Sequence, residues 1–173
     1  MLAGSEHSRG AILDAAQTLF IQQGYAATSM RQIAKNTGLA LGSTYNHFPA
    51  KETIFQTILH ERHPYQHLEA LLTPGHFDRQ KAQSLLDELD QHPEFFNLML
   101  IELVEFKGRH LPELFENLLR DIPSPAPWRA FLSMVVSYHL TRLLLASTLP
   151  PGTQQISPDA FIDLFLHDTL KPE

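Results

Sequence analysis

The sequence predicts an all-α protein with a three-helix N-terminal head and a larger helical body, about nine helices in all. Apolar residues recur at helical spacing, as at Ile12, Ala16 and Phe20 in the first segment. Pro- and Gly-rich breaks such as TPGHFD, IPSPAPW and TLPPGTQQISP separate the apolar segments. No segment shows the alternation of a strand. We place the head at residues 1–48 and the body at residues 49–173.

The first two helices of the head have recognisable ends. In SRGAILDAAQTLFIQQG, Ser8 is the expected N-cap and Gly24 the expected stop. In TSMRQIAKNTG, Thr28 or Ser29 can cap the second helix, and the spacing of Ser29 and Gln32 fits a capping box. The second helix is short, so it needs packing against its neighbours to be stable.

A third short helix follows a tight turn, which gives a helix-turn-helix pattern. Gly38 ends the second helix, the third is expected at residues 41–47, and Pro49 breaks it. The third helix reads LGSTYNH, so it offers small polar and aromatic hydrogen-bonding side chains and no carboxylate. Such a surface suits contact with base edges and phosphates.

The body reads as longer amphipathic helices. Pro93 suits the first turn of one of them, and Ser157 followed by Pro158 suits the start of the last. Its expected helical segments begin at Lys51, Gln80, Pro93, His110, Trp128 and Ser157.

Composition and charge bound the function. The chain is 43% apolar and 18% charged and has no cysteine, which excludes disulfides and cysteine-based sites and fits a cytoplasmic protein. Residues 1–62 carry five basic and four acidic residues, although the whole chain carries 13 and 19. A mildly basic end on an acidic protein is compatible with nucleic acid. We expect no membrane span, metal site or cofactor, and we find no motif of an enzyme.

The run TSMRQIAKNTGLALGSTYNHFPAKETIF, together with ILDAAQTLFIQQGYAATSM before it, resembles the N-terminal signature of the TetR/AcrR family of one-component transcriptional regulators. The resemblance covers about residues 10–59 and implies a homodimer that binds operator DNA through the head. It also implies a small molecule bound in the body that alters the spacing of the heads. The residues it assigns to DNA, by phosphate or base contact, are Thr28, Ser29, Arg31, Leu41, Gly42, Ser43, Thr44, Tyr45, His47 and Lys51.

Simpler interpretations stay open for several of these side chains. Tyr45 can be a half-buried core aromatic, and His47 can interact with the helix dipole. Arg31 and Lys35 can be solvated surface charges. His60, His63 and His67 share a helical spacing, but Pro64 interrupts it and no carboxylate cluster accompanies them.

The body offers apolar candidates for an unknown apolar or amphipathic ligand, although an ordinary core explains most of them equally well. These candidates are Phe96, Met99, Leu103, Trp128, Phe131, Tyr138 and His139. The last two long helices are apolar on more than one side, which favours a homodimer through a four-helix interface.

The sequence therefore predicts a cytoplasmic, dimeric, ligand-responsive DNA-binding regulator, specifically a repressor released from a palindromic operator by a small molecule. The alternative is a helical interaction protein whose DNA-binding head is vestigial or controlled by a co-regulator.

Overall fold

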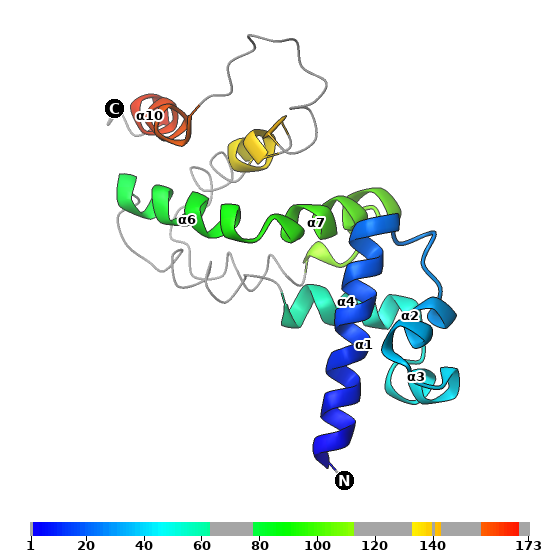
Figure 1. The fold of residues 1–173 in the computed structure, drawn as a ribbon. Helices are drawn as coiled ribbons and strands as arrows, with labels where there is room; N and C mark the ends of the chain where they lie inside the picture. Colours follow the sequence, from blue (N-terminus) through cyan, green and yellow to red (C-terminus); the bar gives the residue numbers. More distant parts are fainter. Residues whose placement is uncertain (1, 63–77, 113–132, 140, 143–156, 170–173) are drawn as a thin grey trace. The chain divides into compact units, whose positions relative to one another are not determined.

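The computed structural model describes residues 2–62, 78–112, 133–139, 141–142 and 157–169. Over these ranges the chain forms eight helices and no strand, close to the nine expected. The all-α prediction is thus confirmed. The chain divides into two compact units, residues 1–63 with 97–114 and residues 64–96 with 115–173 (Figure 1). We describe each unit separately.

The first unit surrounds one apolar core. Its helices are α1 (Leu2–Gln23), α2 (Met30–Thr37), α3 (Leu41–His47), α4 (Lys51–Glu61) and most of α7 (Pro93–Glu105). The buried stripe of α1, with Ile12, Ala16 and Phe20, faces the stripe of α4 around Phe55 and Ile58. Packing of these two stripes holds α1 against α4, and α2 packs on α1 beside them (Figure 1). The short α3 is therefore stabilised by packing against these helices rather than by its own helix propensity.

Both ends of α2 are set by local interactions that can be predicted from the sequence. The hydroxyl of Ser29 accepts a hydrogen bond from the amide of Gln32, and the Gln32 side chain accepts one from the amide of Ser29. This capping box stabilises the helix start by about 1 kcal/mol. Gly38 ends α2 with φ 70°, in the left-handed region, and Gly24 follows α1 with φ 85°. These three expectations are confirmed.

The expected start of the first helix was wrong. α1 begins at Leu2, so Ser8 lies inside it and is not an N-cap. The Ser8 hydroxyl instead donates to the backbone oxygen of Gly4, one turn earlier. Inside a helix a serine satisfies its hydroxyl in this way, and a possible cap is then indistinguishable from an interior residue by sequence alone.

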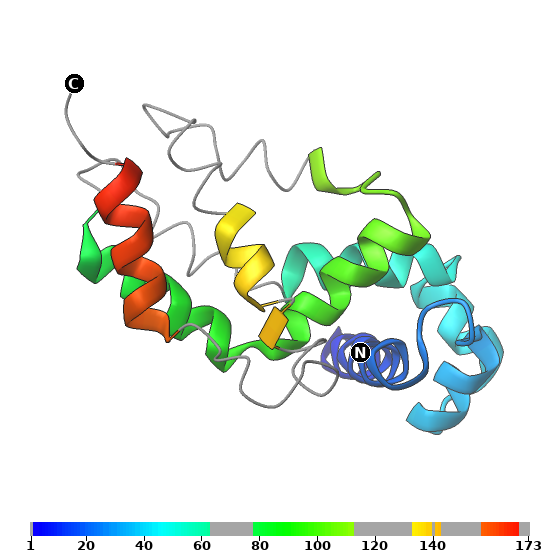
Figure 2. The same ribbon diagram turned by 90° about the horizontal axis from the view of Figure 1, so that it is seen from above.

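The second unit has its own core. It contains α6 (Arg79–Gln91), helical residues 133–139 and α10 (Pro158–Thr169). α10 lies along α6, which Figure 2 shows clearly. Asp78 caps α6 through the amide of Lys81, and Ser157 caps α10 through the amide of Ala160. The buried core residues are Ala82, Leu85, Leu86, Leu89, Phe96, Val135, Phe161 and Ile162.

Replacing Gly38 with alanine tests the dependence of the α2–α3 turn on backbone conformation. No heavy atom lies within 4 Å of the position that its Cβ would occupy, so only the positive φ opposes the change. Because this conformation costs an L-residue ~1–2 kcal/mol, we expect Gly38→Ala to lower the free energy of unfolding by about that amount. Urea unfolding followed by far-UV circular dichroism measures it.

Gly42→Ala is the matched control, because Gly42 lies within α3 and its Cβ position is equally open. Alanine is a better helix former by up to ~1 kcal/mol, so this variant should be more stable than the parent. Loss of the same stability in both variants would show that the turn conformation is not the cause.

Candidate nucleic-acid interface

α2 and α3 form a helix-turn-helix with a fixed turn. The amide of Leu39 donates to the oxygen of Ala34 at 3.2 Å across the left-handed Gly38. The Thr37 hydroxyl donates to the same Ala34 oxygen at 2.9 Å and accepts from the Leu39 amide. The turn therefore has few free polar groups, and it sets the direction in which α3 leaves α2.

The head presents a face without carboxylates. No acidic residue occurs between Asp14 and Glu52 in the sequence, a stretch that includes all of α2 and α3. Both of these carboxylates form ion pairs, Asp14 with Arg62 and Glu52 with Arg109, each at 2.6 Å. Negative charge that would repel a phosphate is therefore neutralised or located elsewhere.

The same pattern separates the cations of the head into paired and open groups. Arg9 binds Glu61 through two hydrogen bonds, which raises the pKa of Arg9 and lowers the pKa of Glu61, in each case chiefly through that hydrogen bonding. Arg31 and Lys35 are exposed on α2 and have no ion-pair partner among the residues that the structure describes. These two are the head's cations available to an anion.

The N-terminus of α2 lies on this face. Ser29 is exposed, and its side chain is engaged in the capping box. The amides of Met30 and Arg31 lie in the first turn, where no intrahelical acceptor exists, so they can donate to a bound phosphate oxygen. Thr28 is different, because its hydroxyl is buried and donates to the oxygen of Gly24 at 2.9 Å. The structure thus gives Thr28 a packing role in place of the expected phosphate contact.

Lys51 forms hydrogen bonds with the backbone of the segment that leads into α2. Its amino group donates to the backbone oxygens of Tyr25 and Thr28, both at 2.6 Å, and lies 4.0 Å from the centre of the Tyr25 ring. Burial lowers the pKa of Lys51, with a smaller opposing effect from Glu105, and burial raises the pKa of Tyr25. The ammonium group points at protein oxygens, so it holds the bend before α2 and is engaged within the protein.

The residues of α3 divide between surface and core. Gly42, Tyr45 and Asn46 are exposed, and Leu41, Ser43 and His47 are partly exposed. Thr44 is fully buried, and its hydroxyl points back to the oxygen of Ala40. Thr44 was expected at a base edge, and this placement corrects that expectation. In a helix of seven residues one position must face the supporting helices, and the sequence does not reveal which small polar residue takes it.

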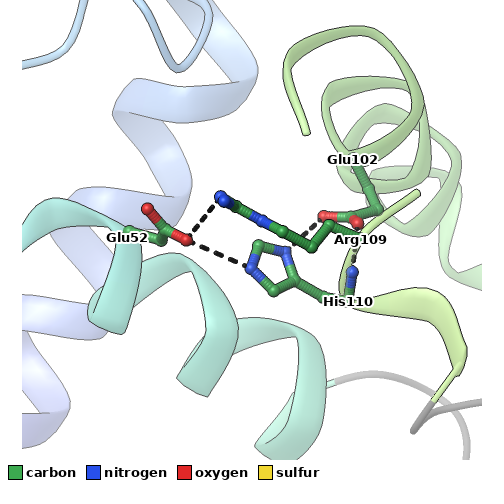
Figure 3. Close-up of polar contacts among 4 residues, drawn as sticks. All are labelled: Glu52, Glu102, Arg109 and His110. Atoms are coloured by element: carbon green, nitrogen blue, oxygen red, sulfur yellow. Dashed lines mark hydrogen bonds and ion pairs between the residues drawn. The ribbon is translucent and has the colours of Figure 1, made fainter. Parts of the chain in front are cut away.

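A polar cluster that sequence reasoning missed joins α4 to the end of α7 (Figure 3). Glu102 is fully buried and accepts hydrogen bonds from the amide of His110 at 2.7 Å and from its Nδ1 at 2.8 Å. The other ring nitrogen of His110 lies 3.3 Å from a Glu52 oxygen, to which Arg109 also donates at 2.6 Å. Glu52 and His110 are 58 residues apart, so no local sequence motif predicts the cluster.

The candidate ligand residues of the body are distributed among different environments. Phe96 and His139 are buried and stack with ring centres 4.3 Å apart. His139 also lies 3.1 Å from Asp90, and Tyr138 packs on the same core from the side. Met99 is partly buried and Leu103 is 47% exposed. Trp128 and Phe131 lie outside the described residues, as do His63 and His67.

Among the described residues, no helix is both long enough and apolar enough to cross a lipid bilayer. No group of three or more His, Asp or Glu side chains in that part of the chain is arranged to hold a metal ion.

Comparison with known proteins agrees with the head and with the fold. Residues 12–58 match the family model described as bacterial regulatory proteins, tetR family. The transcriptional repressor KstR2 of Rhodococcus jostii (strain RHA1) is 42% identical over 57 residues, which are 33% of this chain and 28% of the repressor. The chain thus matches its curated relatives over about a third of their length or less.

Solved structures extend the likeness to the whole chain at the level of the fold. NalD, the secondary repressor of the MexAB-OprM multidrug efflux pump in Pseudomonas aeruginosa, is 23% identical with a TM-score of 0.60, over 95% of this chain and 94% of NalD. The multidrug binding protein EbrR, complexed with imidazole, is 20% identical with a TM-score of 0.65, over 92% of this chain and 93% of EbrR. The head of this chain is therefore similar to that of the tetR family of bacterial regulatory proteins, and the chain shares the fold of these solved structures.

Proposed function

We propose that this protein is a dimeric, ligand-responsive transcriptional repressor that leaves a palindromic operator when a small molecule binds. One observation carries the DNA-binding part of the proposal. The α2–α3 face has open cations, open helix amides and hydrogen-bonding side chains, while the carboxylates nearest to it in sequence are neutralised by arginines. Duplex DNA is the polyanion with the spacing and grooves that a helix-turn-helix fits.

The contacts that we propose fall into two groups. The first-turn amides of α2, with Ser29 and Arg31, bind phosphate, and Tyr45 and His47 bind phosphate from α3. Leu41, Gly42 and Ser43 approach the base edges. Lys51 and Thr28 support the first group from behind, and Thr44 anchors α3. The domain boundary that we propose stays between residues 48 and 49.

The body supplies the dimer and the ligand site in this proposal. A two-fold dimer through the last helices would give the two α3 helices the symmetry of a palindrome. The ligand would be small and apolar or amphipathic, in contact with Phe96, Tyr138 and His139 of the second unit. EbrR is complexed with imidazole, which supports a ligand-binding role for a body of this fold. By preferring the head spacing that does not fit DNA, the ligand would lower operator affinity. We place the protein in the cytoplasm.

An interaction protein with a vestigial or co-regulator-controlled head is the second candidate, because the sequence of the body has no obvious polar pocket. An enzymatic role has no support, because the TetR family consists of transcriptional regulators.

A gel-shift titration against the DNA upstream of the protein's own gene tests the proposal, with random duplexes as competitors and several salt concentrations. We expect one upstream duplex to bind at least ~1000-fold more tightly than competitors, with a steep inverse dependence on salt. Equally weak binding to every duplex would favour the interaction protein.

Arg31→Ala should weaken binding to operator and competitor alike. If Arg31 neutralises one phosphate, the slope of log K against log salt should become shallower by about 1. Lys35→Ala is the matched control, because Lys35 is also exposed on α2 but lies away from the first turn, and we expect a smaller change in slope. An unchanged slope for Arg31→Ala would remove this residue from the interface.

Leu164→Glu should convert the dimer to a monomer. Leu164 is 57% exposed in a single chain and lies on α10, so a charge there should disturb an interface more than the fold. Leu103→Glu changes an almost equally exposed leucine on α7 and should leave the dimer intact. Sedimentation velocity separates the two states, and a dimer that persists in Leu164→Glu would place the interface elsewhere.

A further inference from the structure

His110 lies outside the head, beyond the end of α7, and its side chain is almost fully enclosed. The chain reaches it through a tight reversal in which Lys107 and Gly108 both have positive φ, 57° and 75°. The amide of Gly108 donates to the oxygen of Glu102 at 3.1 Å, so the reversal folds back on the helix. His110 is thereby delivered to the buried carboxylate of Glu102.

Burial makes the link between Glu102 and His110 strong. A carboxylate with no solvent exposure depends on protein donors, and here the amide and ring of one residue provide both. The ring is held further by Phe106, whose centre lies 4.8 Å away. These contacts fix the orientation of the second ring nitrogen, which faces Glu52 in the first turn of α4.

From Glu52 the link continues through the backbone of α4 to its neighbour Lys51. Lys51 precedes Glu52 in the same turn and holds the oxygens of Tyr25 and Thr28. An apolar route runs in parallel, since Phe106 packs on Tyr25 at 4.7 Å and stacks on Phe55 at 4.9 Å. Both routes lead from the end of α7 to the segment just before the Ser29 cap.

We infer that His110 is a positioning residue for DNA binding, which acts through Glu52 and Lys51 to set the position of the α2 N-terminus. The expected effect on operator affinity rests on the proposed function. The expected effect on the position of the α2 N-terminus rests on the geometry alone. The frame of the head therefore includes residues 102–110, although the helix-turn-helix signature ends far earlier in the sequence. His110 touches no nucleic acid in this scheme.

Hydrogen exchange measured by NMR on the protein without DNA tests the geometric part. In His110→Ala the amides of Thr28 and Ser29, which donate to Tyr25 and Gln32, should lose protection by about threefold or more, because the frame behind them is loosened. The interior amides of α1 should be unchanged. Unchanged protection at Thr28 and Ser29 would overturn the inference whether or not the protein binds DNA.

Operator titration tests the functional part. We expect His110→Ala to weaken operator binding roughly 3- to 30-fold, the range for residues that act from outside a site. The salt slope should stay at the parent value, because no phosphate contact is removed. A slope reduced as in Arg31→Ala would identify a direct contact and contradict a positioning role. Failure of the parent protein to bind any duplex would instead refute the proposed function.

His92→Ala is the matched control. His92 also lies between two carboxylates, 3.4 Å from Glu88 and 3.1 Å from Glu94, but it belongs to the other compact unit. His92→Ala should leave hydrogen exchange at residues 28–29 and operator affinity at the parent values. If His92→Ala changed them as much as His110→Ala does, the inference would be overturned. If His110→Ala does not fold, Glu52→Gln weakens the same link at its exposed end and should give the same two results, whose absence would count equally against it.

Discussion

The hydrogen bonds from Lys51 to the oxygens of Tyr25 and Thr28 are the constraint on which the geometry of the head depends. An ammonium group has three donors, and here two go to carbonyl oxygens while the face of an aromatic ring lies beside it. These oxygens belong to the bend between α1 and α2, which has no regular hydrogen-bonded ladder. Without the lysine the bend would lose its only charged support in the described part of the chain, and the α2 cap would move with it.

The charge arrangement of the head also explains how an acidic chain can present a face without unpaired carboxylates. The head does not accumulate cations. Arg9 of the head and Arg62 after α4 neutralise carboxylates on α4 and α1, and Arg31 and Lys35 on α2 have no such partners among the described residues. Since exposed ion pairs contribute little to stability, their larger effect is on the field around the molecule. The position of charge, rather than its total, determines the sign of the α2–α3 face.

The sequence predicts those features whose partners lie within one helical turn. The Ser29 capping box, the Gly38 stop and the bounds of α3 depend on residues three or four positions apart, so they are visible in one dimension. The cluster of Glu102, His110 and Glu52 depends on tertiary folding, and no periodicity encodes it. Ser8 shows the opposite error, because a good local signal was overridden when the helix continued to Leu2.

Because Thr44 is buried, any contacts of α3 with DNA bases would have to come from its other residues. With the Thr44 hydroxyl turned to Ala40, the hydrogen-bonding side chains left on the outer surface of α3 are Ser43, Tyr45, Asn46 and His47. Few bidentate contacts are possible from such a set, and Gly42 adds none. A head of this kind gains affinity from a well-fixed backbone close to the phosphates and gains selectivity from the shape that the duplex must adopt to meet it. In the proposed function, rigid placement of α2 and α3 would matter more for operator choice than any single side chain, and the frame that we infer to extend to residue 110 would supply this rigidity.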